Sequence, residues 1–123
     1  SFGALLDVSR IVAEQLDAGL VNMRFIKPLD EAMIVRMAEK HDCLVTVEDN
    51  VIMGGAGAAV NEVVQRLQLD VQVLNLGLPD TFQDHGSREE LLQEAGLDET
   101  GMRRQIKAFL KHQVNNVVAF QPK

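Results

Sequence analysis

Tryptophan and tyrosine are absent from this sequence of 123 residues, and aromatic packing rests on five phenylalanines. The stacking platforms that single-stranded nucleic-acid binders use are therefore missing. Positive charge is also scarce, because 18 acidic residues outnumber 12 basic ones and leave a formal net charge of −6. Since a polyanion would not be attracted to such a molecule, we expect neither a nucleic-acid partner nor an anionic-membrane partner.

The sequence has one cysteine, Cys43, which excludes a disulfide framework within the chain and favours a reducing compartment. No run approaches the roughly 18 to 20 apolar residues that a membrane span needs. What is present is the balance of a globular domain, with 46% hydrophobic and 24% charged residues. At this length, that balance predicts one domain with a single core.

Helical and strand patterns alternate along the chain. Residues 4–17 place apolar side chains every three to four positions, as on one face of a helix, whereas residues 20–26, 43–47 and 71–76 are short apolar runs typical of buried strands. This alternation predicts an α/β fold, a three-layer α/β/α domain with a small, mostly parallel sheet. Three strands are few for about five helices, so we expect another strand, either upstream of Ser1 or from a partner chain.

The second half of the chain carries clear helix limits. Ser87 and Glu90 have the spacing of a capping box, and Gly96 is placed to end the short helix that follows. We expect the domain to comprise residues 1–112. The tail, residues 113–123, has no clear period, and its apolar patch is compatible with a short strand or a disordered end.

The glycines Gly54, Gly55 and Gly57 follow a predicted strand and precede a predicted helix. Free backbone N–H groups and the helix dipole favour an anion at such a position, so one hypothesis is a phosphate-binding turn. The cluster matches neither the P-loop nor the GxGxxG pattern. The alternative is that the glycines permit positive φ and close helix packing, which the small residues Ala58 and Ala59 favour.

Glu48 and Asp49 end the strand before this turn, where ligands of open α/β sheets bind. Neighbouring residues of an extended chain point to opposite sides, so these carboxylates should not form a catalytic dyad, and we interpret Glu48 as an acceptor for the glycine turn. His85 lies in a turn-rich loop and is the histidine best placed to contact a ligand or partner. No histidines have metal-ligand spacing, so we expect no metal site.

Several stretches together resemble the C-terminal domain of the 1-deoxy-D-xylulose-5-phosphate synthases, a family of the transketolase superfamily. They are VNMRFIKPLD at 21–30, VTVEDN at 45–50, MGGAG at 53–57, NLGLPD at 75–80 and HGSREELL at 85–92. Their order and spacing are specific to the family, and the resemblance covers residues 2–110, nearly the whole chain.

This resemblance implies a three-domain enzyme that joins pyruvate and glyceraldehyde 3-phosphate, with loss of carbon dioxide, for isoprenoid, thiamine and pyridoxal synthesis. It implies thiamine diphosphate and Mg²⁺ as cofactors, held by two preceding domains, so that this chain has no catalytic or cofactor-binding residue and is inactive alone. Glu48 is then not the glutamate that activates thiamine. The family also implies a strand leading into Ser1, a homodimer, docking on the preceding domains and a cytoplasmic or plastid location.

Two other functions stay open at this point. A free-standing regulatory module would hold a phosphorylated metabolite or nucleotide in the glycine turn. The equivalent C-terminal domain of a 2-oxo acid dehydrogenase β subunit would instead dock an acyltransferase core.

Overall fold

The computed structural model describes residues 1–82 and 85–119, with side chains up to Gln113. Two parallel strands, β1 (Cys43–Val51) and β2 (Gln72–Leu78), pair from Cys43 opposite Gln72 to Val47 opposite Leu76. The helices are α1 (Leu6–Gln15), α2 (Glu31–Ala38), α3 (Ala56–Arg66), α4 (Arg88–Glu94) and α5 (Glu99–Ala119), and a 3₁₀ turn over Gly3–Leu5 precedes α1.

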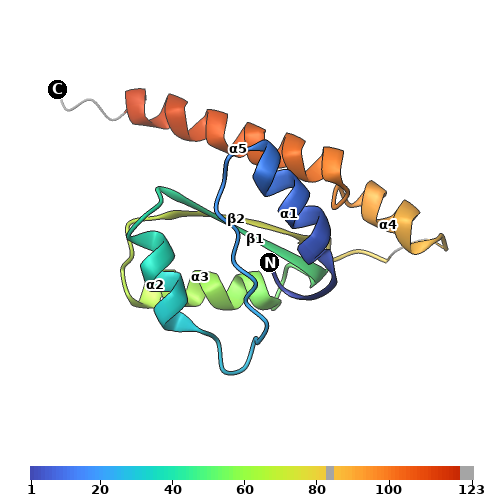
Figure 1. The fold of residues 1–123 in the computed structure, drawn as a ribbon, viewed down its shortest axis with the longest axis horizontal. Coiled ribbons are helices and arrows are strands. Elements are labelled where there is room, and N and C mark those ends of the chain that lie inside the picture. Colours follow the sequence, from blue (N-terminus) through green and yellow to red (C-terminus); the bar gives the residue numbers. More distant parts are fainter. Residues whose placement is uncertain (83–84, 120–123) are drawn as a thin grey trace.

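Helices cover both faces of this sheet, with α1 and α5 above the strands and α2 and α3 below them in Figure 1. Successive side chains of a strand point to opposite faces, so Val45 packs with the first group of helices and Leu44 with the second. The first core contains the buried residues Leu5, Val12, Val47, Leu76, Leu97 and Met102, and the second contains Phe2, Ile34, Ala56, Val60 and Val63. The expected three-layer α/β/α arrangement is confirmed.

Helix ends follow the local signals of the sequence. Asp30 caps α2 by accepting from the Met33 N–H at 2.9 Å. The capping box of α4 is complete, because the Glu90 N–H donates to Ser87 Oγ at 3.2 Å and the Ser87 N–H donates to Glu90 Oε2 at 2.8 Å. These bonds to Ser87 hold the pKa of the Glu90 carboxyl below its usual value. Gly96 takes a φ of +67° directly after α4 and ends it as predicted.

Residues 20–26 do not form the strand that their apolar run predicts, so the described part of the sheet has two strands rather than three. A strand needs a hydrogen-bonded neighbour along its length. Among the residues that the structure describes, this segment pairs only with Ser1, whose amino group donates to Val21 O at 2.7 Å and whose carbonyl accepts from the Met23 N–H at 3.1 Å. The prediction was wrong because hydrophobic periodicity reports burial and not the position of backbone partners.

The last helix is longer than the sequence suggests. Its backbone is helical through Ala119, so a short strand over the apolar patch at 117–119 is wrong, while residues 120–123 lie outside the described chain. The expected domain limit near His112 stays a prediction. Within the described residues, no helix is both long and apolar enough to cross a membrane.

The amino group of Ser1 should make stability depend on pH. Burial lowers the pKa of this group from 8.0 to about 6. The unfolded chain then binds the proton more tightly than the folded chain between pH 6 and 8, so stability should rise with pH across that window. A pKa difference of two between the unfolded and folded chain corresponds to about 2.7 kcal/mol. We therefore expect the free energy of unfolding to rise by about 2 to 3 kcal/mol across this window.

Urea denaturation of this 123-residue chain at pH 5.5 and 8.5 measures the effect. The matched control is the same chain acetylated at Ser1, which keeps an N–H donor but cannot be protonated. All other groups titrate equally in the two proteins. The difference between their changes in free energy of unfolding, from pH 5.5 to 8.5, therefore isolates the amino group. An equal change in both proteins would contradict the prediction.

Candidate functional site

The candidate site lies at the end of the sheet where β1 and β2 finish, beside α4 and the start of α3 (Figure 1). Glu48 is buried there, with 2% of its surface exposed. Its carboxylate accepts from the Ala56 N–H at 2.7 Å and from the Gly57 N–H at 2.9 Å, the first two residues of α3. A carboxylate at this position satisfies the free backbone N–H groups of the first helical turn and stabilises the positive end of the helix dipole. The interpretation of Glu48 as the acceptor for the glycine turn is confirmed.

The glycines around Glu48 allow this close approach. A Cβ at Gly55 would contact Glu48 Oε2 and the Val51 carbonyl, and a Cβ at Gly57 would lie 2.5 Å from Thr46 Oγ1. Gly54 differs from both, because its φ of +70° favours glycine in the turn and no atom lies within 4 Å of its would-be Cβ. The glycines therefore do what the alternative to a phosphate site predicted: Gly54 permits a positive φ, and Gly55 and Gly57 permit close packing.

A polar pair from the two strands lies under the start of α3. Thr46 Oγ1 donates to Asn75 Oδ1 at 2.8 Å, from facing positions of β1 and β2. A Cβ at Gly57 would also lie 3.0 Å from Asn75 Oδ1. This pair is not among the residues predicted from the sequence. Its signal was a polar residue between apolar neighbours in each strand, because a buried polar group needs a hydrogen-bond partner.

Asp49 points away from Glu48, as the alternation of a strand requires, and forms an ion pair with Arg88 at 2.6 Å. Hydrogen bonding to Asp49 raises the pKa of the Arg88 guanidinium. The pair joins the end of β1 to the first turn of α4. A cation is unfavourable at a helix N-terminus, so the position of Arg88 in the sequence was a signal that it needs an acidic partner.

His85 is exposed in the loop before α4. Within the described residues, no hydrogen bond or ion pair joins it to the glycine turn, so the structure does not assemble all five candidates into one site. Met53 and Phe82 also expose their side chains at this end of the sheet. The candidates thus divide into a buried corner around Glu48 and an exposed loop containing His85.

The donor set of the corner limits its chemistry. Glu48 already occupies the two N–H groups that would hold a phosphate, and it would repel a second anion. Within the described residues, no three His, Cys, Asp or Glu side chains are grouped to hold a metal ion. The residues of this corner therefore do not fit a diphosphate with its Mg²⁺. An interdomain or anion-binding role for Glu48, Gly54, Gly55, Gly57 and His85 stays a prediction.

Known proteins similar to this chain include two bacterial synthases. It is 58% identical over 110 residues to the 1-deoxy-D-xylulose-5-phosphate synthase of Thioalkalivibrio sulfidiphilus (strain HL-EbGR7) and 56% identical over 110 residues to that of Escherichia coli (strain K12 / DH10B). These alignments cover 89% of this chain but 17% and 18% of the two synthases. The chain therefore spans less than a fifth of the length of these relatives.

Among solved structures, the fold is similar to a chain of a protein described as "Split gene transketolase, inactive beta4 tetramer". The TM-score is 0.79 at 26% sequence identity, over 87% of this chain and 36% of that chain. The family described as "Transketolase, C-terminal domain" matches residues 1–102. Because that match covers most of the 123 residues, the chain belongs to the family of transketolase C-terminal domains.

Proposed function

We propose that this chain works as the C-terminal domain of a thiamine-diphosphate-dependent 1-deoxy-D-xylulose-5-phosphate synthase. The complete enzyme would join pyruvate and glyceraldehyde 3-phosphate with loss of carbon dioxide, in the cytoplasm or a plastid. The observation that carries this proposal is the identity of more than half of the aligned residues to synthases of two bacteria. The other transketolase-like structure is far less similar in sequence.

Within that enzyme, the chain would serve assembly and not chemistry. Preceding domains would hold thiamine diphosphate and Mg²⁺, and this domain would dock on them and contribute to a homodimer. The occupied donors at Glu48 and the missing metal-ligand group in the described residues support this division of roles. The exposed side chains of Met53 and Phe82 offer apolar surface for docking.

An activity assay of the purified chain tests the proposal. We expect no 1-deoxyxylulose 5-phosphate from pyruvate, glyceraldehyde 3-phosphate, thiamine diphosphate and Mg²⁺, because the residues of this chain do not fit the cofactor. The full-length enzyme is the positive control, and a cooperative thermal transition shows that the isolated chain is folded. Product formation by the folded chain alone would overturn the proposal.

Calorimetry separates this proposal from a phosphate-binding regulatory module. With Glu48 seated at the start of α3, inorganic phosphate and nucleotides should show no saturable binding to the isolated chain. Tight binding that is lost on changing Gly57 would favour the regulatory module instead. A 2-oxo acid dehydrogenase β subunit would be indicated by binding to an acyltransferase core, which we do not expect.

A further inference from the structure

Charge is distributed unevenly along this chain. All 18 acidic residues lie within residues 1–99, together with seven basic ones, whereas residues 100–123 contain five basic residues and no acidic one. Helix α5 therefore carries most of its charge with one sign, on a chain whose net charge is −6. An asymmetry of this size favours contact between the basic helix and an acidic surface.

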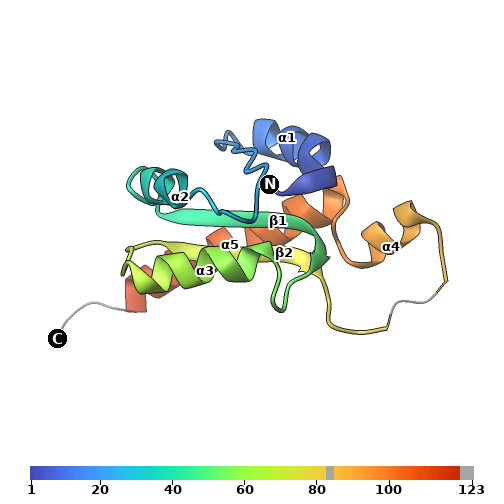
Figure 2. The ribbon, with the colours of Figure 1, turned by 90° about the horizontal axis from the view of Figure 1, so that it is seen from below.

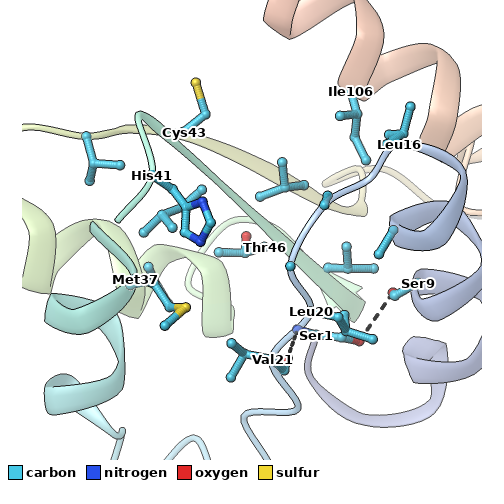
Figure 3. A pocket seen from close by; sticks show the side chains of 18 of the residues that line it. Ser1, Ser9, Leu16, Leu20, Val21, Met37, His41, Cys43, Thr46 and Ile106 are labelled. Carbon is cyan, nitrogen blue, oxygen red and sulfur yellow. Dashed lines mark hydrogen bonds between the residues drawn. The ribbon is translucent and has the colours of Figure 1, made fainter. Parts of the chain in front are cut away.

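Three cations share one exposed side of α5. Arg104, Lys107 and Lys111 are exposed, and none of them forms an ion pair with any residue that the structure describes. Successive helical residues are rotated by about 100°, so these three lie within about 60° of one another and nearly opposite the buried Met102. Figure 3 shows Ile106 on the inner side as well, facing the pocket beside β1. The three cations form an outward-facing group, here called the basic stripe.

Helix α4 carries the opposite charge. Glu89 and Glu94 are exposed, and within the described part of the chain neither forms an ion pair. The other charged residues of α4 have partners, because Glu90 completes the capping box and Arg88 pairs with Asp49. Glu89 and Glu94 are therefore left uncompensated and are here called the acidic pair.

The connection between α4 and α5 keeps the two charged groups apart. Asp98 accepts from the Gly101 N–H at 3.1 Å, and Gln105 Nε2 donates to Gly96 O at 2.8 Å, which fixes the turn between the helices. Figure 1 and Figure 2 both place α4 at one end of the molecule and the last turns of α5 at the other.

This separation is long on the scale of electrostatic screening. From residue 99 to residue 111 the helix rises about 18 Å, at about 1.5 Å per residue. Salt screens exposed charges over about 8 Å at physiological ionic strength. Within one copy, the acidic pair therefore does not neutralise the far end of the basic stripe.

We propose that two copies of this chain associate along the edge formed by α4 and α5, with the α5 helices antiparallel. The acidic pair of each copy then lies against the basic stripe of the other. A twofold axis forms both contacts at once and closes the assembly at two copies. This proposal rests on the homodimer proposed above and names its contact surface.

Charge complementarity favours a second copy over other occupants of the basic stripe. An anionic membrane or a nucleic acid would meet the acidic excess of residues 1–99 and be repelled by most of the molecule. An antiparallel second copy presents its acidic pair only where the basic stripe lies. A head-to-tail contact would leave one charged group free on each terminal copy and would continue into longer chains.

The expected association is weak and depends on salt. Exposed ion pairs are individually weak, and they contribute more to specificity than to affinity. Leu110, three residues after Lys107, is 41% exposed and adds some apolar area.

Sedimentation of the 123-residue chain over a range of concentrations tests the proposal. We expect dimers whose dissociation constant rises at least about tenfold between about 0.01 M and about 1 M salt, because the screening length falls from about 30 Å to about 3 Å. Absence of dimers at low salt, or a dissociation constant that salt does not change, would overturn the proposal. Growth beyond two copies would overturn the twofold arrangement.

Charge reversal tests which groups meet. Lys107→Glu with Lys111→Glu makes both ends of the edge acidic, and Glu89→Lys with Glu94→Lys makes both ends basic. Each double variant alone should dimerise at least about tenfold more weakly. An equimolar mixture should recover the dimer, because each reversed group then meets its opposite charge. With both variants folded by circular dichroism, a mixture that stays monomeric would overturn the arrangement.

A matched variant controls for net charge. Arg36→Glu with Lys40→Glu gives the same change in net charge at exposed positions in and directly after α2. Figure 1 places α2 on the opposite side of the sheet from α5. This variant should dimerise as the unchanged chain does. An equal loss of dimers would mean that net charge governs association, and the proposed contact would be wrong.

Anionic vesicles test the other occupant. Flotation with vesicles of phosphatidylcholine and phosphatidylserine should recover no bound chain. Binding that is lost in Lys107→Glu with Lys111→Glu would assign the basic stripe to a membrane surface and overturn the proposal. Failure of the dimer contact would leave the activity assay of the proposed synthase domain unchanged, so the two proposals can fail separately.

Discussion

Replacing Glu48 by alanine is expected to lower the free energy of unfolding by about 3 kcal/mol, because two donors lose their acceptor and each unsatisfied buried donor costs about 1 to 3 kcal/mol. The Ala56 and Gly57 N–H groups are the donors concerned. Water cannot readily replace the carboxylate, since the side chain is almost completely buried. Urea denaturation of the isolated chain, at a pH where the reference protein is most stable, measures the change.

Two substitutions serve as controls for this result. Glu48→Gln keeps one oxygen acceptor and the shape of the side chain, so it should cost about half as much as Glu48→Ala. Asp49→Asn removes the charge of the next residue, whose ion pair with the exposed Arg88 should contribute much less to stability than the buried bonds of Glu48. A loss at Glu48 no larger than the loss at Asp49 would contradict the assigned role.

Replacing Gly55 by valine should have the second large effect. The new Cβ would contact the Val51 carbonyl and would lie 2.7 Å from Glu48 Oε1, so either the strand end or the capping carboxylate must move. Overpacking of this kind costs about 1 to 3 kcal/mol, and displacement of Glu48 adds to it. In the full-length enzyme, we expect fewer dimers by sedimentation and normal turnover in the dimers that remain.

The neighbouring glycine provides the matched control. Gly54 has a positive φ but no atom near its would-be Cβ, and asparagine tolerates this conformation better than other residues. Gly54→Asn should therefore cost less stability than Gly55→Val and leave the dimer content unchanged. An intact dimer with abolished turnover in Gly55→Val would contradict a packing role and would place this corner in the chemistry.

Local signals were sufficient for much of the fold. The capping box at Ser87, the helix stop at Gly96 and the strand beginning at Cys43 all lie where the sequence places them. Each depends on residues within a few positions of one another, so spacing and side-chain chemistry predict them without knowledge of distant contacts. The bonds from the glycine turn to Glu48 were also predictable, because the carboxylate and the helix start are only eight residues apart in the chain.

Contacts between distant segments were not predictable in this way. Arg88 and Asp49 are 39 residues apart, and Thr46 and Asn75 are 29 residues apart. Each residue type has many possible partners in the sequence, and only the parallel pairing of β1 with β2 and the return of α4 to the strand ends select these ones. The loop containing His85 likewise gave no spacing from which its distance to the glycine turn could be inferred.

By itself, the sequence determined the three-layer α/β class, the limits of α4 and the acceptor role of Glu48, because hydrophobic period, caps and turn residues act over short stretches of chain. The tertiary structure decided which apolar runs become strands. Residues 20–26 have the composition of a strand, but among the described residues they pair only with Ser1, and a sheet is stabilised by hydrogen bonds between segments and not within them.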